Sequence, residues 1–597
     1  MASEPGREFA HNSEVVMEST YEAIVIGTGF GGAITSCRLA KKWPGQVLVL
    51  ERGKRYPMGS FARTPHDMAS AFFVLSDDQK PRPKAIRSAV AKKNSNEAHG
   101  IFDVRNYKHM DVLIGAGLGG GSLIYANVFM IPPDEVFDDR WPSSCKRSVL
   151  EPYYRIAKQV LGSRPIPVAT GDPRREILRT KVFEEVAKKN GRKSDLVDIN
   201  VFFGNDFNNP TPIGVQEKNR YGAIQTSCMY CAECDMGCNY HAKNTLDLNY
   251  LFVAENRYQA KIRTEHLVTK IVPVNVSGAD DADGSGEHGY RVYFRDLLAE
   301  RKELRSALGK RVVVSSGSLG STELLLQCKE DFKTLPRISD ALGKSFSGNG
   351  DFLSFVLNSK QPVNSNYGPV ITQRTDFNLF ERFDRDKAFI LEDASYGAIL
   401  AWYIDGVEPR FLSIKPILEI LRHWITQWVS GKSLGRLGWA VADFLNNDVS
   451  YNTAVLLCMG LDRSNGVMSL DRNHQLAIDW PFKDSMSLYQ AILNGGKEFA
   501  HTLGSKLFIP LPTWNRPIRN NVTVHALGGC VLADDSSRGV TNADRKAFGE
   551  VFGYEHLYVA DGAIVPTSVG ANPTATISAL SEMVAEGITG IVPSSDL

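Results

Sequence analysis

The stretch YEAIVIGTGFGG, residues 21–32, decides the fold of this chain. Its first six residues form a short apolar run, which is typical of a buried parallel strand. The glycines that follow satisfy the pattern G-x-G-x-x-G, in which they allow a tight turn, close approach of backbone to a pyrophosphate, and packing of a helix on the strand. The stretch therefore predicts a dinucleotide-binding turn. Its expected cofactor contacts are Gly27, Gly29, Phe30, Gly31 and Gly32.

A second strand is expected at Gln46–Leu50, after a helical pattern that extends from Gly32 to about Trp43. Strand, glycine turn, helix and strand make a βαβ unit, and the positive end of its helix points at the phosphates. Glu51 ends the second strand, where it is placed to accept a hydrogen bond from a ribose hydroxyl. This position favours FAD or NAD over a cofactor with a 2′-phosphate.

A second glycine-rich segment, GAGLGGGSLIYAN (115–127), distinguishes between these two cofactors. So many glycines imply that the backbone passes against a flat and bulky group that leaves no room for Cβ atoms. An isoalloxazine ring fits that description, and the alternative is an ordinary glycine loop. The expected contacts in this segment are Gly115, Gly119, Gly120, Gly121, Ser122 and Asn127.

The composition excludes several classes of protein. A net charge of +1 over 597 residues gives no global field toward nucleic acid or anionic lipid, so no nucleic-acid partner is expected. The first twenty residues lack the apolar core of a signal peptide, and no apolar run reaches the ~18 residues of a membrane span. We therefore expect a cytoplasmic protein. The final Ser-Asp-Leu is a near miss to a peroxisomal address, which keeps the peroxisome as the alternative.

The chain is long enough for two domains, and its patterns change along its length. Further βα elements are expected at residues 310–315 and 556–560, whereas 350–410 and 450–515 alternate as in an antiparallel sheet. The predicted class is α/β, with a Rossmann-type FAD-binding domain and an inserted α+β substrate domain that contains an antiparallel sheet. The FAD-binding domain is expected over 18–130, 225–348 and 521–597, and the substrate domain over 131–224 and 349–520.

Four blocks of the sequence resemble the glucose–methanol–choline (GMC) oxidoreductase family and, within it, the cholesterol oxidase-like branch. They are IVIGTGFGGA (24–33) with Glu51, GAGLGGGSLIYAN (115–127), VVVSSGSLGSTELLL (312–326), and HALGGC (525–530) with VADGAIVPTSVGANPTATI (559–577). The resemblance implies that FAD accepts hydride at N5 from the hydroxyl carbon of a sterol, terpenoid or long-chain alcohol, as in steroid or lipid metabolism. Members that link FAD covalently often use a histidine near the second block. That block contains none here, so non-covalent FAD is implied, although His109 lies just upstream.

The resemblance also assigns catalytic side chains. His525 matches the family's active-site histidine, which donates to or accepts from the substrate oxygen near neutral pH, and the alternative is a structural histidine. Asn572 matches the second active-site position, where an amide orients the alcohol without acting as a base. Glu392 is the candidate for the substrate-domain glutamate of cholesterol oxidases, against a surface or salt-bridging glutamate. A carboxylate there would allow a Δ5-to-Δ4 proton shift after oxidation.

A helix is expected to begin with Pro573, which suits the first helical position. Its first N–H groups and the positive end of its dipole would then stabilise the N1–C2=O edge of the reduced flavin. The resemblance places an acid near the phosphate–ribityl region of FAD, at the end of the preceding strand. The expected contacts from this part of the chain are Asp561, Gly562, Pro573 and Thr574.

Four of the nine cysteines have the spacing C-x2-C-x2-C-x3-C of a bacterial ferredoxin motif. Asn239 replaces the usual proline after the last cysteine, and no second run exists. Three interpretations stay open: reduced structural thiols, an iron–sulfur cluster, and a zinc site or disulfide. With a cluster, electrons could pass to a carrier; without one, O2 is the expected acceptor. The possible ligands are Cys228, Cys231, Cys234 and Cys238.

Residues 414–429 form a plausible amphipathic helix after Pro416. Ile417, Leu421, Trp424 and Trp428 share one face of it. One interpretation is core packing. The other is a lid, or a surface that rests on a membrane, above an apolar substrate.

Overall fold

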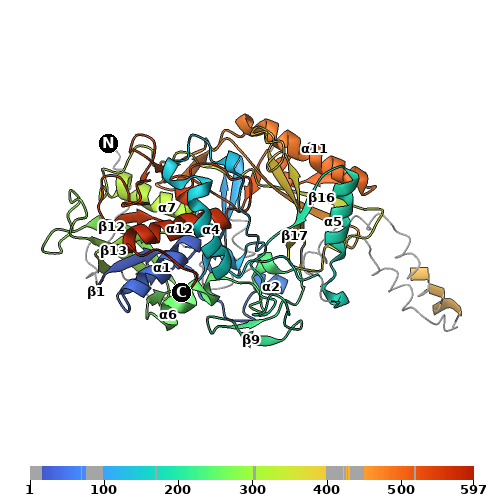
Figure 1. Cartoon of the computed structure of the whole chain (residues 1–597), viewed down its shortest axis with the longest axis horizontal. Helices are drawn as coiled ribbons and strands as arrows, with labels where there is room; N and C mark the ends of the chain where they lie inside the picture. The colour runs from blue at the N-terminus through green and yellow to red at the C-terminus, as the bar shows by residue number, and fades with distance from the viewer. Residues whose placement is uncertain are drawn as a thin grey trace.

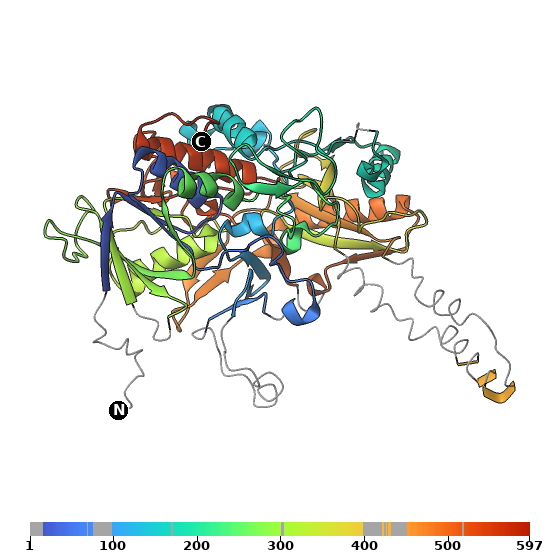
Figure 2. The same ribbon diagram turned by 90° about the horizontal axis from the view of Figure 1, so that it is seen from below.

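The computed structural model describes residues 16–597 except 69, 76–97, 169–170, 300–303, 398–420, 423–424, 427, 431–449 and 516–518. The described chain forms two lobes side by side, each built around its own sheet (Figures 1 and 2). We call them the nucleotide lobe, which contains the glycine turn of residues 27–32, and the substrate lobe. Among the described residues, no helix is long and apolar enough to cross a membrane.

A five-stranded parallel sheet, in the order β11-β3-β2-β15-β26, forms the centre of the nucleotide lobe. Every residue of β2, β3, β15 and β26 is buried, because these unbroken apolar runs are covered on both faces. The strands are β2 (Ala23–Ile26), β3 (Val47–Leu50), β11 (Lys261–Arg263), β15 (Val312–Val314) and β26 (Leu557–Val559).

Helices and a second sheet surround this parallel sheet. Helix α1 packs on β2, β3 and β15 and also contacts α6 and α12, while α12 contacts α4 (Figure 1). The helices are α1 (Phe30–Lys42), α4 (Arg147–Val160), α6 (Tyr250–Asn256), α7 (Gly317–Leu326) and α12 (Thr574–Thr589). The second sheet has the order β1-β14-β13-β12 and touches β3 through β12. Its strands are β1 (Val16–Tyr21), β12 (His266–Pro273), β13 (Tyr290–Asp296) and β14 (Leu304–Gly309).

A six-stranded antiparallel sheet, in the order β22-β16-β19-β18-β17-β8, forms the substrate lobe. Helices α5 (Leu178–Lys189) and α11 (Met486–Thr502) pack against this sheet and against each other (Figure 1). The strands are β8 (Ser194–Leu196), β16 (Phe352–Leu357), β17 (Ile371–Phe377), β18 (Phe389–Ala394), β19 (Ala454–Gly460) and β22 (Leu507–Pro510).

A small three-stranded sheet, β23-β7-β6, brings two predicted functional segments together. Its strands are β6 (Phe102–Tyr107), β7 (Met110–Gly115) and β23 (Asn521–Thr523). Strand β7 leads into the second glycine segment, and β23 leads to His525. Because β23 pairs with β7 in parallel, with Thr523 opposite Val112, both segments leave the sheet at the same edge.

The predicted fold class is confirmed: a Rossmann-type parallel sheet lies beside a lobe with an antiparallel sheet. The strands expected at 310–315 and 556–560 are present as β15 and β26. The domain boundaries stay a prediction. On the proposed helix of 414–429, Ile417 and Trp424 lie outside the described residues. Leu421 and Trp428 are helical and 48% and 89% exposed, so core packing is wrong for these two side chains.

Candidate functional site

Thr28 is the centre of the first glycine turn. Its N–H and its hydroxyl donate to one carboxylate oxygen of Glu51 at 3.0 and 2.6 Å, and the hydroxyl accepts from the Gly119 N–H at 3.1 Å. The Gly53 N–H donates to the other oxygen of Glu51 at 2.8 Å. These contacts fix Glu51 at the end of β3, where burial raises the pKa of its carboxyl. The motif did not reveal Thr28, because it occupies a variable position of the pattern.

The two glycine segments pack against each other. Gly120 has a φ of 52°, and a Cβ on it would lie 2.7 Å from the Cα of Gly29. On the other side of the turn, a Cβ on Gly31 would lie 1.4 Å from the carbonyl oxygen of Ala560, just after β26. Three remote segments therefore meet at the start of α1, and only glycine fits at the contacts.

Open space remains at two other glycines of these segments and at Gly317, the first residue of α7. A Cβ added to Gly29, Gly121 or Gly317 would meet no atom of the described residues within 4 Å. Asn127 ends the second glycine segment with a φ of 71°; it is buried, and within the described structure its amide has no nitrogen or oxygen partner. The Cys234 thiol lies beside that amide. A glycine-lined surface with a buried amide that has no nitrogen or oxygen partner fits a flat cofactor such as the expected FAD.

The Ser122 side chain, by contrast, forms its hydrogen bonds within the protein. Its hydroxyl donates to the Gly119 carbonyl at 2.7 Å and accepts from the Leu246 N–H at 3.2 Å, and its side chain is buried. Gly115 ends β7 and packs on Gly120. These residues shape the turn, and their contact with a cofactor stays a prediction.

Helix α12 begins one residue later than expected. Pro573 is its N-cap and Thr574 its first helical residue, so the prediction of Pro573 as the first helical position is wrong by one residue. The Pro573 carbonyl accepts from the Ile577 N–H at 2.9 Å. The earlier N–H groups of this turn have no partner within a helix, and the positive end of the helix dipole lies here.

Asp561 ties β26 to α7. Its carboxylate accepts from the Gly317 N–H at 2.9 Å, from the Ser321 hydroxyl at 2.5 Å and from the Ala563 N–H at 2.7 Å. Burial raises its pKa to about 6. The next residue, Gly562, accepts at its carbonyl from the Gly528 N–H at 2.9 Å, which links this turn to the HALGGC block.

His525 is held by a carboxylate that sequence reasoning missed. Its Nδ1 lies 2.8 Å from Oδ1 of Asp351, and the His525 side chain keeps an exposed fraction of 14%. The other oxygen of Asp351 accepts from the Val524 N–H and from the Thr523 hydroxyl, both at 2.9 Å. Asp351 lies in SFSGNGD (345–351), which matches no catalytic motif, so the sequence carried no signal for it.

Asn572 faces Glu392 rather than capping α12. Its Nδ2 lies 3.4 Å from Oε2 of Glu392, and Glu392 lies on β18 with no exposed surface. Among the described residues, neither Oδ1 of Asn572 nor Oε1 of Glu392 has a hydrogen-bonding partner. Burial raises the pKa of Glu392 well above the usual range of a carboxyl. The interpretation of Glu392 as a surface residue is therefore wrong.

One loop, residues 347–351, holds the segments of both His525 and Asn572. Ser347 and Leu527 exchange backbone hydrogen bonds, two residues beyond His525. The Asn349 amide donates to the Ala571 carbonyl at 2.8 Å and accepts from the Val569 N–H at 2.9 Å. The loop thus fixes the HALGGC block relative to the segment that precedes α12.

The four cysteines of the run are free thiols, and three of them are buried. In the part of the chain that the structure describes, no three His, Cys, Asp or Glu side chains are grouped to hold a metal ion. Backbone N–H groups of Tyr230 and Ala242 donate to Cys228 and Cys238 at 3.4 and 3.2 Å. Burial raises the pKa of the Cys231 thiol to about 12. The three interpretations of the cysteine run therefore stay predictions.

Lys243 connects the cysteine run to the second glycine segment. Its ammonium is buried and donates to the carbonyls of Leu123, Tyr125 and Cys234 at 3.1, 2.9 and 2.7 Å. Burial lowers the pKa of Lys243 to about 8. All three protons of the ammonium therefore hold main-chain carbonyls of these two segments.

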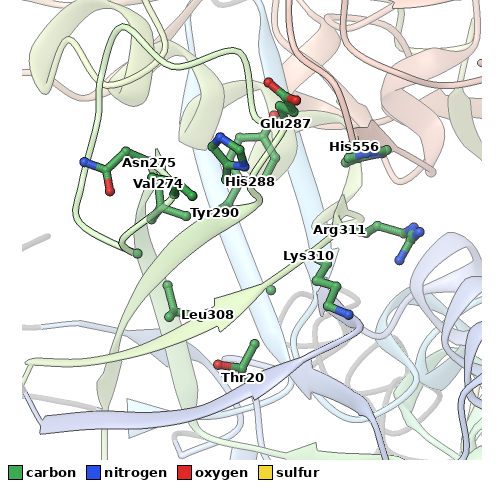
Figure 3. Close-up of a pocket in the computed structure, with 13 residues that line it drawn as sticks. Thr20, Val274, Asn275, Glu287, His288, Tyr290, Leu308, Lys310, Arg311 and His556 are labelled. Atoms are coloured by element: carbon green, nitrogen blue, oxygen red, sulfur yellow. The ribbon is translucent and has the colours of Figure 1, made fainter.

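A cavity of about 330 Å³ lies elsewhere in the nucleotide lobe (Figure 3). Residues of β1, β13 and β14 line it, together with Lys310, Arg311 and His556. Both cations are already paired with Glu22, at 2.5 and 3.2 Å. Its lining includes none of His525, Asn572 and Glu392, so this cavity is not part of the candidate site.

Comparisons with known proteins agree with this architecture. Two models described as GMC oxidoreductase match residues 212–328 and 467–581. A cholesterol oxidase of Acinetobacter baumannii is 27% identical over 94% of this chain and 93% of its own length. A cholesterol oxidase of Mycobacterium tuberculosis is also 27% identical, over 95% of this chain and 91% of its own.

Solved structures share the fold at lower identity. A fungal aryl-alcohol oxidase has a TM-score of 0.56 and 14% identity, covering 96% of this chain and 99% of its own. Formate oxidase has a TM-score of 0.57 and 13% identity, covering 96% and 98%. From the matched models, the relatives along most of its length and the shared fold, this chain belongs to the GMC oxidoreductase family, whose members are generally FAD-dependent, and its sequence is similar to cholesterol oxidases.

Proposed function

We propose that this protein binds FAD non-covalently and oxidises the hydroxyl of a hydrophobic alcohol, such as a sterol, terpenoid or long-chain alcohol, to a carbonyl. The observation that carries this proposal is the convergence of His525 and Asn572 through the loop 347–351. Both side chains belong to segments next to the glycine-lined open space. A proton acceptor and an orienting amide are what alcohol oxidation needs from the protein.

Each side chain has a distinct role in this proposal. FAD, when bound, supplies the acceptor for the hydride that leaves the alcohol carbon. His525 receives the hydroxyl proton, and Asn572 binds the same oxygen through its amide. The first turn of α12 offers N–H groups and a positive dipole end to negative charge that develops nearby. Its proposed contact is with the flavin, through Thr574 and the N–H groups that follow it.

Non-covalent attachment is supported by the position of His109. It lies in the turn between β6 and β7, at the opposite end of β7 from Gly115, and its Nδ1 lies 3.1 Å from the Arg519 carbonyl. A histidine engaged there is far along the strand from the glycine segment that would cover a flavin. The remaining glycine-turn residues, Asn127 and Asp561 are proposed to surround the cofactor.

The acceptor is proposed to be O2, with hydrogen peroxide as product, because the relatives are named oxidases. A dehydrogenase with an iron–sulfur cluster at the cysteine run is the second candidate, favoured by the cysteine spacing alone. A third is a flavin-dependent isomerase, for which the buried Glu392 would serve as the proton carrier. Exposed Leu421, Ile425 and Trp428 support a peripheral contact with a membrane that holds the substrate.

The first experiment is an anaerobic absorbance spectrum of the purified protein before and after addition of a sterol alcohol. We expect flavin bands near ~450 nm that bleach on addition and return with O2 as peroxide forms. Acid precipitation should release the flavin, because the link is non-covalent. A broad absorbance that remains with the protein would favour the cluster. Flavin bands that no sterol, terpenoid or long-chain alcohol bleaches would contradict the proposed reaction.

A further inference from the structure

We infer that Asp351 is a positioning residue: it holds His525 in the tautomer with a proton on Nδ1 and a bare Nε2 that receives the alcohol proton. The inference rests on the proposed function for the identity of the proton donor. It rests on the structure for the tautomer, because Oδ1 of Asp351 lies 2.8 Å from Nδ1 of His525.

The surroundings of Asp351 suit an ionised carboxylate. Val524 and Thr523 donate to Oδ2, so Oδ1 is left for the ring of His525. An ionised carboxylate only accepts, and Nδ1 must therefore carry the proton of this hydrogen bond. The other nitrogen of a neutral imidazole is then an acceptor. In the reaction, the O–H bond of the alcohol breaks and a bond from its proton to Nε2 forms.

Asp351 is the acidic side chain that contacts His525 directly. Glu392, Cys458 and Tyr489 lie near Asp351, and burial raises the pKa of each of them well above its usual value. Asp462 also lies nearby, where it accepts from the Gly350 N–H at 3.3 Å, and burial raises its pKa as well. Burial therefore favours the neutral form of each of these groups. When His525 takes the proton, the imidazolium formed is paired with a carboxylate that is already in place.

The backbone of the loop keeps Asp351 in position. Gly350 has a φ of 62°, and a Cβ on it would lie 2.5 Å from the Gly460 carbonyl oxygen. Asp462 accepts from the Ser347 hydroxyl at 2.7 Å and from the Gly348 N–H at 3.0 Å. Asp351 itself is 2% exposed. It is therefore a fixed group rather than a surface acid that rotates toward His525.

Asp351→Asn tests the inference because it changes polarity with little change in shape. The amide oxygen must stay on the side of the Val524 N–H, which needs an acceptor. The amide NH2 then faces Nδ1 of His525 and forces that nitrogen to accept. We expect the proton of His525 to move to Nε2, the nitrogen that should receive the alcohol proton.

The tautomer is read directly by NMR of the FAD-loaded protein labelled with 15N-histidine, with the signal assigned by its loss in His525→Ala. We expect wild type to show protonated Nδ1 and bare Nε2, and Asp351→Asn to show the reverse. In stopped flow with a sterol alcohol, the limiting rate of flavin reduction should fall about a hundredfold. The alcohol concentration for half-maximal rate should change less than about twofold, because binding is retained.

Asp376→Asn is the matched control, since it makes the same exchange at another carboxylate that accepts from backbone N–H groups, those of Leu379, Phe380 and Glu381. We expect an unchanged tautomer and a rate within about threefold of wild type. An unchanged 15N pattern in Asp351→Asn, or an equal loss of rate in both variants, would overturn the assignment. If the tautomer inverts but no alcohol reduces the wild-type flavin, the positioning role stands and the proposed oxidation fails.

Discussion

Asn572 and Glu392 face each other between the two lobes, with 3.4 Å between Nδ2 and Oε2, although 180 residues separate them in the chain. Asn572 precedes α12 of the nucleotide lobe, and Glu392 belongs to the central part of the substrate sheet. Oδ1 of Asn572 and Oε1 of Glu392 have no hydrogen-bonding partner in the described structure. The pair therefore has free hydrogen-bonding capacity for a substrate between the lobes.

Replacing Glu392 with glutamine separates oxidation from a proton shift. Glutamine keeps the shape and the contact with Asn572 but has no proton to transfer between carbons. With a Δ5 sterol as substrate, we expect peroxide formation within about tenfold of wild type and migration of the double bond slower by at least about a hundredfold. Peroxide release and the absorbance of the conjugated ketone measure the two steps. Equal loss of both would assign Glu392 to binding or folding.

Removal of the His525 ring should affect chemistry and not cofactor binding. His525→Ala is expected to keep FAD bound and to slow flavin reduction at least about tenfold, because the proton acceptor is lost. Stopped-flow absorbance measures the rate, and the flavin-to-protein ratio measures retention. His474→Ala serves as control, since that ring is exposed and pairs with Asp331. Reduction at the wild-type rate would remove His525 from the mechanism.

Gly29 should tolerate a methyl group in the protein but not in the complex with FAD. A Cβ there meets no described protein atom within 4 Å, so the loss should concern the space for the cofactor. We expect Gly29→Ala to weaken FAD retention and Gly29→Val to abolish it, with far-UV circular dichroism unchanged. Gly587→Ala on α12, where a Cβ makes ordinary contacts from 3.5 Å, is the control. A fully yellow Gly29→Val protein would refute the phosphate-turn assignment.

Lys243 should stabilise the second glycine segment, which is proposed to cover the flavin. Lys243→Met leaves the carbonyls of Leu123 and Tyr125 without this donor, and each unpaired group costs about 1–3 kcal/mol. The Cys234 carbonyl keeps only the Gly237 N–H, at 3.3 Å. We expect a lower thermal midpoint and faster loss of FAD in gel filtration. Lys506→Met, at an exposed position, should behave as wild type. A Lys243→Met protein with unchanged FAD retention would show that the hydrogen bonds of Lys243 do not support the cofactor site.

Asp561 should make stability fall as the pH rises. Burial raises its pKa to about 6, from 3.8 for an exposed carboxyl, so the folded state holds its proton more tightly. That contribution is present below about pH 3.8 and is lost as the pH rises through about 6. Between these limits, the difference in unfolding free energy between wild type and Asp561→Asn should fall by about 3 kcal/mol. Urea unfolding at several pH values measures it; a pH-independent difference would contradict the burial effect.

The sequence predicted those parts of the site that depend on local patterns. The glycine turn lies in a short motif whose spacing reflects backbone geometry close by in the chain, and His525 and Asn572 were assigned through the resemblance of their blocks to the GMC family. Asp351 lies 174 residues from His525, and nothing in its own neighbourhood indicates that the fold brings the two together. Thr28 was missed for a different reason, because its hydroxyl connects Glu51 and Gly119 from a position where the motif allows any residue. Contacts between side chains that are remote in the sequence can be identified only from the folded structure.

The parallel sheet of the nucleotide lobe can be completed only late in synthesis, when its last strand has been made. Ribosomes make proteins from the N-terminus, so the turn at Gly27 is synthesised long before β26 (Leu557–Val559), its fellow strand in one sheet. All six strands of the substrate sheet emerge in between, five of them within residues 352–510. The nascent chain therefore carries the residues of the glycine turn for most of its synthesis without His525 or Asn572. We therefore expect productive loading with flavin to be a late event of biosynthesis, and a prematurely terminated chain would lack His525 and Asn572.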